Sequence, residues 1–155
     1  MALVLSESEQ VAVMFEVMST RSDWVYAHIA FQHYVSKEND FATWVEGFVD
    51  VYRDELTRLV DGMRSFVDAD ESVAEFSFEP VAEPSFELRF RRCPPSDQGG
   101  ILAFAALDIK RVLELTIPAA YRDNRVSLQL RTNEHRVSKF VNQLFLEADR
   151  VLCGG

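Results

Sequence analysis

The chain has 155 residues, of which 48% are hydrophobic and twelve are phenylalanine, so a disordered chain is excluded and a single domain over 1–155 is expected. Its formal net charge is −9, which argues against nucleic-acid partners and against anionic membranes, because both favour basic surfaces. The first 70 residues hold 13 acidic and 5 basic side chains, so this half carries most of the charge.

The N-terminal third predicts three β-strands, at 3–6, 11–18 and 24–35. Side chains of the third strand alternate between two faces, one more apolar and the other mixed. The apolar face consists of Val25, Ala27, Ile29, Phe31 and Val35, and the mixed face of Trp24, Tyr26, His28, Gln32 and Tyr34.

The next segment changes its period, which predicts a first amphipathic helix at about 40–64. Asn39 or Asp40 is expected to cap this helix, since either side chain can accept a hydrogen bond from the free N–H groups of the first turn. The apolar stripe recurs at three- and four-residue steps through Phe41, Trp44, Val45, Phe48, Tyr52, Leu56, Leu59, Val60 and Met63.

Residues 74–90 predict a β-hairpin whose two strands alternate apolar and polar residues. The favoured register places Phe78 opposite Phe86 and Glu75 opposite Arg89. It gives one continuous apolar face and one cross-strand ion pair on the other face.

The C-terminal half predicts more strands and a second helix. Strands are predicted at 101–109, 112–117 and 126–131, the first being a central strand because it is apolar on both faces. A second amphipathic helix is predicted at about 133–152, capped by Thr132 or Asn133. Since short loops join consecutive strands, the expected fold class is α+β, with a curved antiparallel β-sheet of about six to eight strands and two packed helices.

No residue pattern in the chain predicts catalysis, a metal site or a cofactor, so a non-enzyme is expected. His28 and His33 are five residues apart on one predicted strand, so they face opposite sides and cannot share a metal ion. Cys93 has no base indicated beside it and is expected to be a free thiol. The acidic segment 68–79 fails as a calcium loop, because Val73 occupies the position that requires glycine.

Cysteine usage and hydropathy predict the compartment. Two cysteines are too few for a disulfide framework, and no stretch approaches the roughly 18 apolar residues of a membrane span or has the pattern of a secretory signal. We therefore expect a reduced, cytoplasmic protein without membrane contact.

Four acidic residues form the candidate partner-binding surface: Glu46, Asp50, Asp54 and Asp61. On the predicted helix the first three are four residues apart on the solvent side, where like charges repel by a few tenths of a kcal/mol per pair. This spacing fits a surface that steers a basic protein partner. It also fits an ordinary solvated helix face, and the sequence leaves both interpretations open.

Four stretches carry a family resemblance: DFATWVEGFVDVYRDELTRL, FELRF, GGILAFAALDI and VSLQLRTNEHRVSKFVNQLFLEADRVL. With them, the region from about Phe41 to Leu152 resembles the WapI-type immunity proteins of bacterial contact-dependent toxin systems and related uncharacterised immunity-like proteins. The resemblance implies strands, a helix, an antiparallel sheet and a C-terminal helix. It also implies a cytoplasmic protein that binds and blocks a cognate toxin and has no catalysis of its own.

The function expected from the sequence is that of a non-catalytic protein-binding protein, an immunity protein whose acidic surface suits a basic toxin domain. One alternative is a small-molecule-binding or enzymatic α+β domain with a pocket between the sheet and the helices. Another is a structural subunit that forms a homodimer through an edge strand.

Overall fold

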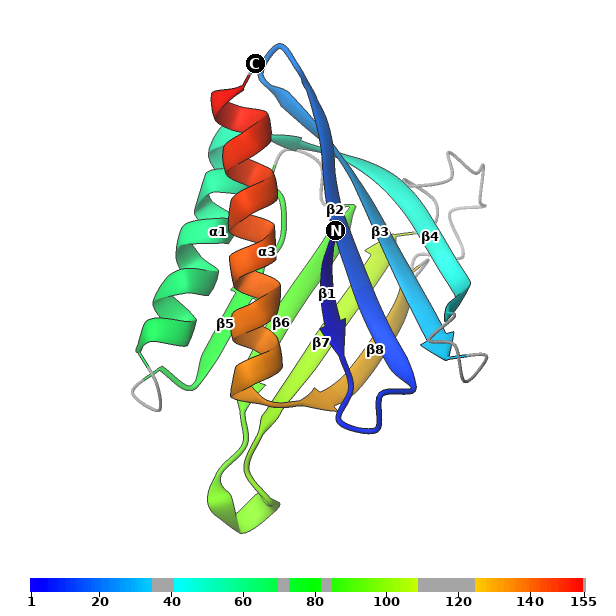
Figure 1. The fold of residues 1–155 in the computed structure, drawn as a ribbon, viewed down its shortest axis with the longest axis vertical. Coiled ribbons are helices and arrows are strands. Elements are labelled where there is room, and N and C mark those ends of the chain that lie inside the picture. Colours follow the sequence, from blue (N-terminus) through cyan, green and yellow to red (C-terminus); the bar gives the residue numbers. More distant parts are fainter. Residues whose placement is uncertain (35–40, 70–72, 82–84, 109–124, 155) are drawn as a thin grey trace.

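The computed structural model describes residues 1–34, 41–69, 73–81, 85–108 and 125–154. These residues form two antiparallel sheets and two long helices (Figure 1). Sheet A consists of β1 (Ala2–Leu5), β2 (Val11–Arg21), β3 (Trp24–Tyr34) and β4 (Phe41–Tyr52), in that spatial order. Sheet B consists of β5 (Glu75–Phe78), β6 (Phe86–Arg92), β7 (Ile101–Asp108) and β8 (Arg125–Thr132). The helices are α1 (Arg53–Asp68) and α3 (Glu134–Cys153), and a short 3-10 turn spans Pro95–Asp97.

The expected α+β class is confirmed, with eight antiparallel strands among the described residues. They divide into two sheets of four instead of one continuous curved sheet. The strand predicted at 112–117 lies outside the described residues. Within the described part of the chain, neither helix is long and apolar enough to cross a membrane.

Both sheets and both helices bury their apolar sides in one shared core. Phe15 of β2 meets Phe86 of β6 with ring centroids 5.7 Å apart, which joins the two sheets directly. Phe90 of β6 contacts Phe66 of α1 and Phe140 of α3, at 6.4 and 6.1 Å between centroids. Figure 1 shows α1 and α3 side by side at one end of the two sheets, with β1 running beside α3. Aromatic rings and aliphatic side chains thus pack together between the sheets and the helices.

The helix predicted at about 40–64 is wrong over its first half, because β4 occupies Phe41–Tyr52 and α1 begins only at Arg53. Residues four apart share a face in a helix and also in a strand, so the apolar spacing of this segment fits both. The tertiary context decides, since β4 pairs with β3 along its whole length and buries Val49 and Val51. β-Branched valines favour this pleated, half-buried setting. The predicted caps Asn39 and Asp40 lie outside the described residues.

The hairpin at 74–90 has the predicted faces but a register shifted by two residues. Phe78 pairs with Leu88 and Glu75 with Arg91, in place of the predicted Phe86 and Arg89. A slip of two residues keeps every side chain on its own face, so the alternation of the sequence cannot distinguish the two registers. The second helix agrees closely with its prediction, and Asn133 caps it by accepting a hydrogen bond from the Arg136 N–H at 2.9 Å.

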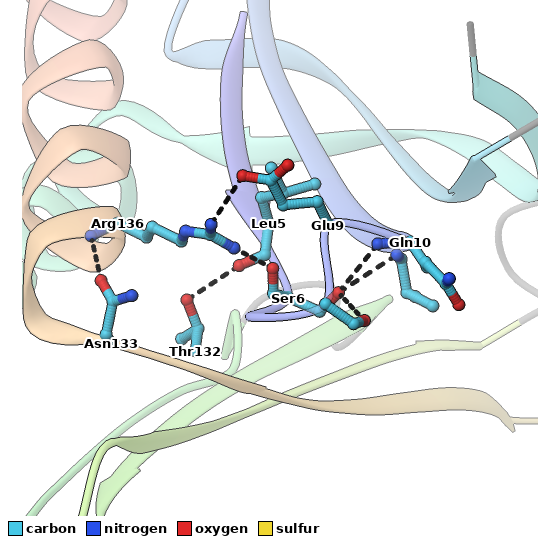
Figure 2. Close-up of polar contacts among 9 residues, drawn as sticks. Leu5, Ser6, Glu9, Gln10, Thr132, Asn133 and Arg136 are labelled. Atoms are coloured by element: carbon cyan, nitrogen blue, oxygen red, sulfur yellow. Dashed lines mark hydrogen bonds and ion pairs between the residues drawn. The ribbon is translucent and has the colours of Figure 1, made fainter. Parts of the chain in front are cut away.

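A polar junction fastens the N-terminal hairpin to the start of α3 (Figure 2). The Thr132 hydroxyl donates to the Leu5 carbonyl at 2.8 Å. The Arg136 guanidinium donates to the Ser6 carbonyl and to Glu9 Oε1. Sheet A and sheet B are thus joined at this corner by hydrogen bonds as well as through the core.

Candidate interaction surface

The outer face of sheet A carries exposed aromatic side chains over β3 and β4. Because the two strands pair in a fixed antiparallel register, Trp24 lies opposite Tyr52 and His28 opposite Phe48. The exposed fractions of Phe48 and Tyr52 are 46% and 38%, large for rings of this size. We call this surface the aromatic–acidic face and define it by Trp24, Tyr26, His28, Glu46, Phe48, Asp50 and Tyr52.

The rings of this face are stacked across the two strands. Trp24 and Tyr52 lie 3.9 Å apart between centroids with an interplanar angle of 25°. Phe48 lies between Tyr26, at 5.3 Å and 8°, and His28, at 4.7 Å and 21°. Cross-strand aromatic pairs contribute roughly 0.2–1 kcal/mol each, so they hold the rings in place without burying them. The result is a pre-ordered apolar platform open to solvent.

Carboxylates are interleaved with the rings. Glu46 Oε2 lies 2.8 Å from His28 Nε2, which fixes the imidazole against Phe48. Asp50 stands directly opposite Tyr26 in the register. Its carboxylate forms no hydrogen bond or ion pair with any other residue in the described part of the chain. One carboxylate of the face is therefore engaged, and the other is available.

Two depressions flank the Trp24–Tyr52 stack. The first, of about 540 Å³, is lined by Asp23, Tyr52, Arg53, Asp54, Glu55 and Val81. The second, of about 310 Å³, is lined by Arg21, Ser22, Trp24 and Asp50. Among the described residues, the face and these borders hold five acidic side chains and two arginines. The acids are Asp23, Glu46, Asp50, Asp54 and Glu55, and the arginines are Arg21 and Arg53.

The four acidic residues predicted to share one helix face are distributed over two elements. Glu46 and Asp50 project from β4 as part of the aromatic–acidic face. Asp54 lies in the first turn of α1, on the border of the first depression. Asp61 lies seven residues further along α1, roughly 10 Å away along the helix axis, and does not belong to this surface. Three of the four thus lie on or beside the outer side of β4. They do so because β4 is a strand that leads directly into α1, and not because they share one helix face.

Sequence reasoning missed the aromatic residues of β4 as surface groups, because it assigned Phe48 and Tyr52 to a buried helix stripe. The signal that could have found them is the alternation Glu46, Phe48, Asp50, Tyr52, in which acid and ring occupy every second position. Between them stand Gly47, Val49 and Val51, all buried. This period of two indicates a strand with an aromatic and acidic outer side.

His28 and His33 have separate aromatic partners, as their predicted opposite orientation implies. His28 stacks on Phe48, whereas His33 stacks on Trp44 with centroids 5.1 Å apart. Within the described residues, no group of three or more histidine, cysteine or acidic side chains is placed to hold a metal ion.

The outer face of sheet B has a different character, with four arginines: Arg89, Arg91, Arg125 and Arg131. Arg89 lies over the Phe104 ring, 5.0 Å from its centroid, and bonds Glu87 at 2.6 Å. That hydrogen bond is the main reason why the pKa of Arg89 is raised. Arg125 bonds both Glu79 and Glu87. Cation and carboxylate thus alternate here, and the local charge differs from that of sheet A.

Comparison with known proteins identifies no family. The chain matches no family model and no curated protein sequence. It is similar to the solved structure of the plant transcriptional regulator PBF-2, with a TM-score of 0.46 and 8% identity over 94% of this chain and 79% of that one. It is also similar to WHY3 from Arabidopsis thaliana, with a TM-score of 0.41 and 10% identity over 92% of this chain and 83% of that one. Likenesses of this degree assign neither a function nor a partner.

The expectation that nucleic acid is excluded as a partner needs correction, because it is drawn from the net charge of the whole chain alone. The physical reason is that net charge sums over the whole chain, whereas binding depends on the local field. The arginines of sheet B show how far the local and overall charge differ in this molecule. The exclusion based on net charge is therefore withdrawn.

Proposed function

We propose that this chain is a non-catalytic protein-binding protein that uses the aromatic–acidic face to bind a basic protein partner. The observation that carries the proposal is the open platform of stacked rings with carboxylates between them. Monomeric proteins rarely expose contiguous apolar surface without a use for it. Aromatic residues are also the side chains that most often dominate binding energy at protein interfaces.

Electrostatics supports a basic partner. Five acidic side chains against two arginines give the face and its borders a negative local field. Such a field accelerates the encounter with a positively charged surface and discourages like-charged ones. A second copy of this acidic chain would bring carboxylate against carboxylate, so a different, basic protein fits the face better.

In its specific form, the proposal is that of a cytoplasmic immunity protein that neutralises a cognate toxin by occlusion. It rests on the sequence resemblance described above. The two cysteines, Cys93 and Cys153, are unpaired, which is compatible with a reducing compartment.

The test is to identify the genes beside this one, to express any toxin-like protein that they encode with and without this chain, and to measure growth and binding. Changing Phe48 to Ala removes the central ring of the platform. We expect binding at least tenfold weaker and loss of protection, because a central aromatic hot spot contributes about 2 kcal/mol or more. Leu146→Ala is the matched control, since Leu146 is an equally apolar side chain, 65% exposed, on α3. Equal binding by wild type and Phe48→Ala would show that the platform is not the interface.

A further inference from the structure

The outer side of β4 alternates acid and ring with the period of an extended chain. Glu46, Phe48, Asp50 and Tyr52 follow one another at every second residue, which places neighbouring groups about 6.6 Å apart. A segment lying along β4 in extended conformation presents its own side chains at the same spacing. The two patterns match only when the segment alternates cationic and apolar residues.

Asp50 is the position on this face at which a cationic side chain would gain the most binding energy. Its carboxylate has no partner in the described part of the chain, and Tyr26 stands directly opposite it. Phe48 and Tyr52 flank it on the same strand, and Trp24 shares the second depression with it. A lysine or arginine head placed there meets one carboxylate and the faces or edges of several rings, which combines an ion pair with cation–π attraction. Glu46 is a weaker position, since His28 already occupies one of its oxygens.

We propose that the partner presents an extended segment of alternating cationic and apolar side chains, and that this segment lies along β4 with one cation on Asp50. This inference rests on the proposed function and names the chemistry of its partner. Charge complementarity selects the occupant, because phosphate groups and a second acidic copy would both meet repulsion from Asp50 and Glu46 at this face.

The experiment uses Trp24 as the reporter, since it belongs to the face and is one of only two tryptophans in the chain. In a Trp44→Phe background, the probe is a synthetic peptide in which every second residue is alternately lysine and leucine, with serine between. A control peptide has the same composition with its lysines and leucines in separate blocks. We expect the alternating peptide to shift the Trp24 emission and to bind several-fold more tightly than the block peptide, with affinity falling as salt rises.

The decisive variant is Asp50→Asn, which removes the charge and keeps the shape. We expect it to weaken peptide binding about threefold to fivefold, the range for one exposed ion pair beside an aromatic ring. Asp61→Asn, an exposed acid on α1 outside the face, is the matched control and should change nothing. Equal weakening by both variants, or equal binding of both peptides, overturns the inference. So does a shift of Trp24 emission caused by a single-stranded oligonucleotide or by self-association.

The two proposals fail in different ways. If the toxin-like protein binds and Phe48→Ala abolishes binding while Asp50→Asn does not alter it, the inference about the segment is wrong and the interface stands. If binding of that protein is indifferent to Phe48→Ala, the proposed function itself is wrong.

Discussion

Glu147 of α3 is the clearest case in which a single residue supports a local irregularity of the backbone. The pairing of β2 with β3 shifts between Val17 and Ser19, which leaves backbone groups of the bulge without partners in the sheet. Glu147 Oε2 accepts the Val17 N–H at 2.9 Å, and Arg150 donates to the Val17 carbonyl at 3.5 Å. Glu147 is only 8% exposed, and its other oxygen, Oε1, forms an ion pair with the N-terminal amino group of Met1.

Replacing Glu147 with alanine should therefore destabilise the fold. The Val17 N–H would lose its acceptor in a buried position, at a cost of about 1–3 kcal/mol of unfolding free energy. Urea denaturation measures the difference. Asn142→Ala, an exposed substitution on the same helix, should lie within about 0.5 kcal/mol of wild type. A Glu147→Ala protein as stable as this control would mean that the bulge does not depend on the carboxylate.

At the scale of single residues, the orientation of the β3 side chains could be predicted from the sequence. Val25, Ala27 and Ile29 are buried as their alternation indicates, and Trp24 and Tyr26 point to the other face. Their stacking partners could not be predicted, because Tyr52 and Phe48 stood on a segment assigned to a helix. The bulge contact of Glu147 also left no signal, since it joins residues 130 positions apart.

Among the elements, the strand–helix boundary at Tyr52 and Arg53 was the hardest to predict. The four-residue steps of the apolar pattern in 41–64 fit both structures, and the strand is distinguished by the alternation from Glu46 to Tyr52 and by the pairing with β3. By contrast, the C-terminal helix could be predicted closely. Its apolar stripe is long, its cap at Asn133 is a favoured residue, and no strand competes for its buried face.

The turn between β6 and β7 contains two adjacent glycines whose substitutions can be compared. Both have a left-handed backbone, with φ of +62° at Gly99 and +77° at Gly100. A Cβ on Gly99 would meet no atom within 4 Å, whereas one on Gly100 would lie 2.9 Å from the Thr132 carbonyl oxygen. Gly99→Ala should therefore cost about 1 kcal/mol of unfolding free energy from the backbone alone.

Gly100→Ala should cost at least about 1 kcal/mol more, since overpacking against a fixed backbone group adds to the same strain. Thermal unfolding of the two variants side by side provides the comparison. Equal melting temperatures would indicate that β8 can move away from the turn, and would contradict a close contact between Gly100 and Thr132.

At the scale of the whole molecule, the two sheets do not form one continuous sheet. They are connected at the corner where β1, β8 and α3 meet. The alternation of the sequence predicts two helices and about six to eight strands, but it does not predict β4 among them. The division of the strands into two sheets could not be predicted, because it depends on which strands become edges, and no local pattern encodes that choice. The junction in Figure 2 is made of single side chains, each unremarkable in sequence.

Arg136→Gln should loosen this junction. It removes the ion pair with Glu9 and weakens the bond to the Ser6 carbonyl, and we expect a loss of about 1–2 kcal/mol. Amide hydrogen exchange should rise first in β1, which this arginine holds at its end. Lys139→Gln, an exposed change one turn further along α3, serves as the control. Unchanged protection of β1 in Arg136→Gln would show that the strand is held by the core alone.

The same junction sets an order of assembly for the growing chain. Ser6 meets Arg136 across 130 positions and Leu5 meets Thr132 across 127, so these contacts cannot form until residues 132–136 have been synthesised. Closing so long a loop costs entropy that is recovered only when both ends are in place. Until α3 emerges from the ribosome, the N-terminal hairpin has neither its clamp nor the helix that covers it. Completion of the fold is therefore expected to be late, and a chain interrupted before α3 would keep the strands of the aromatic–acidic face without the helix that packs against β1 and β2.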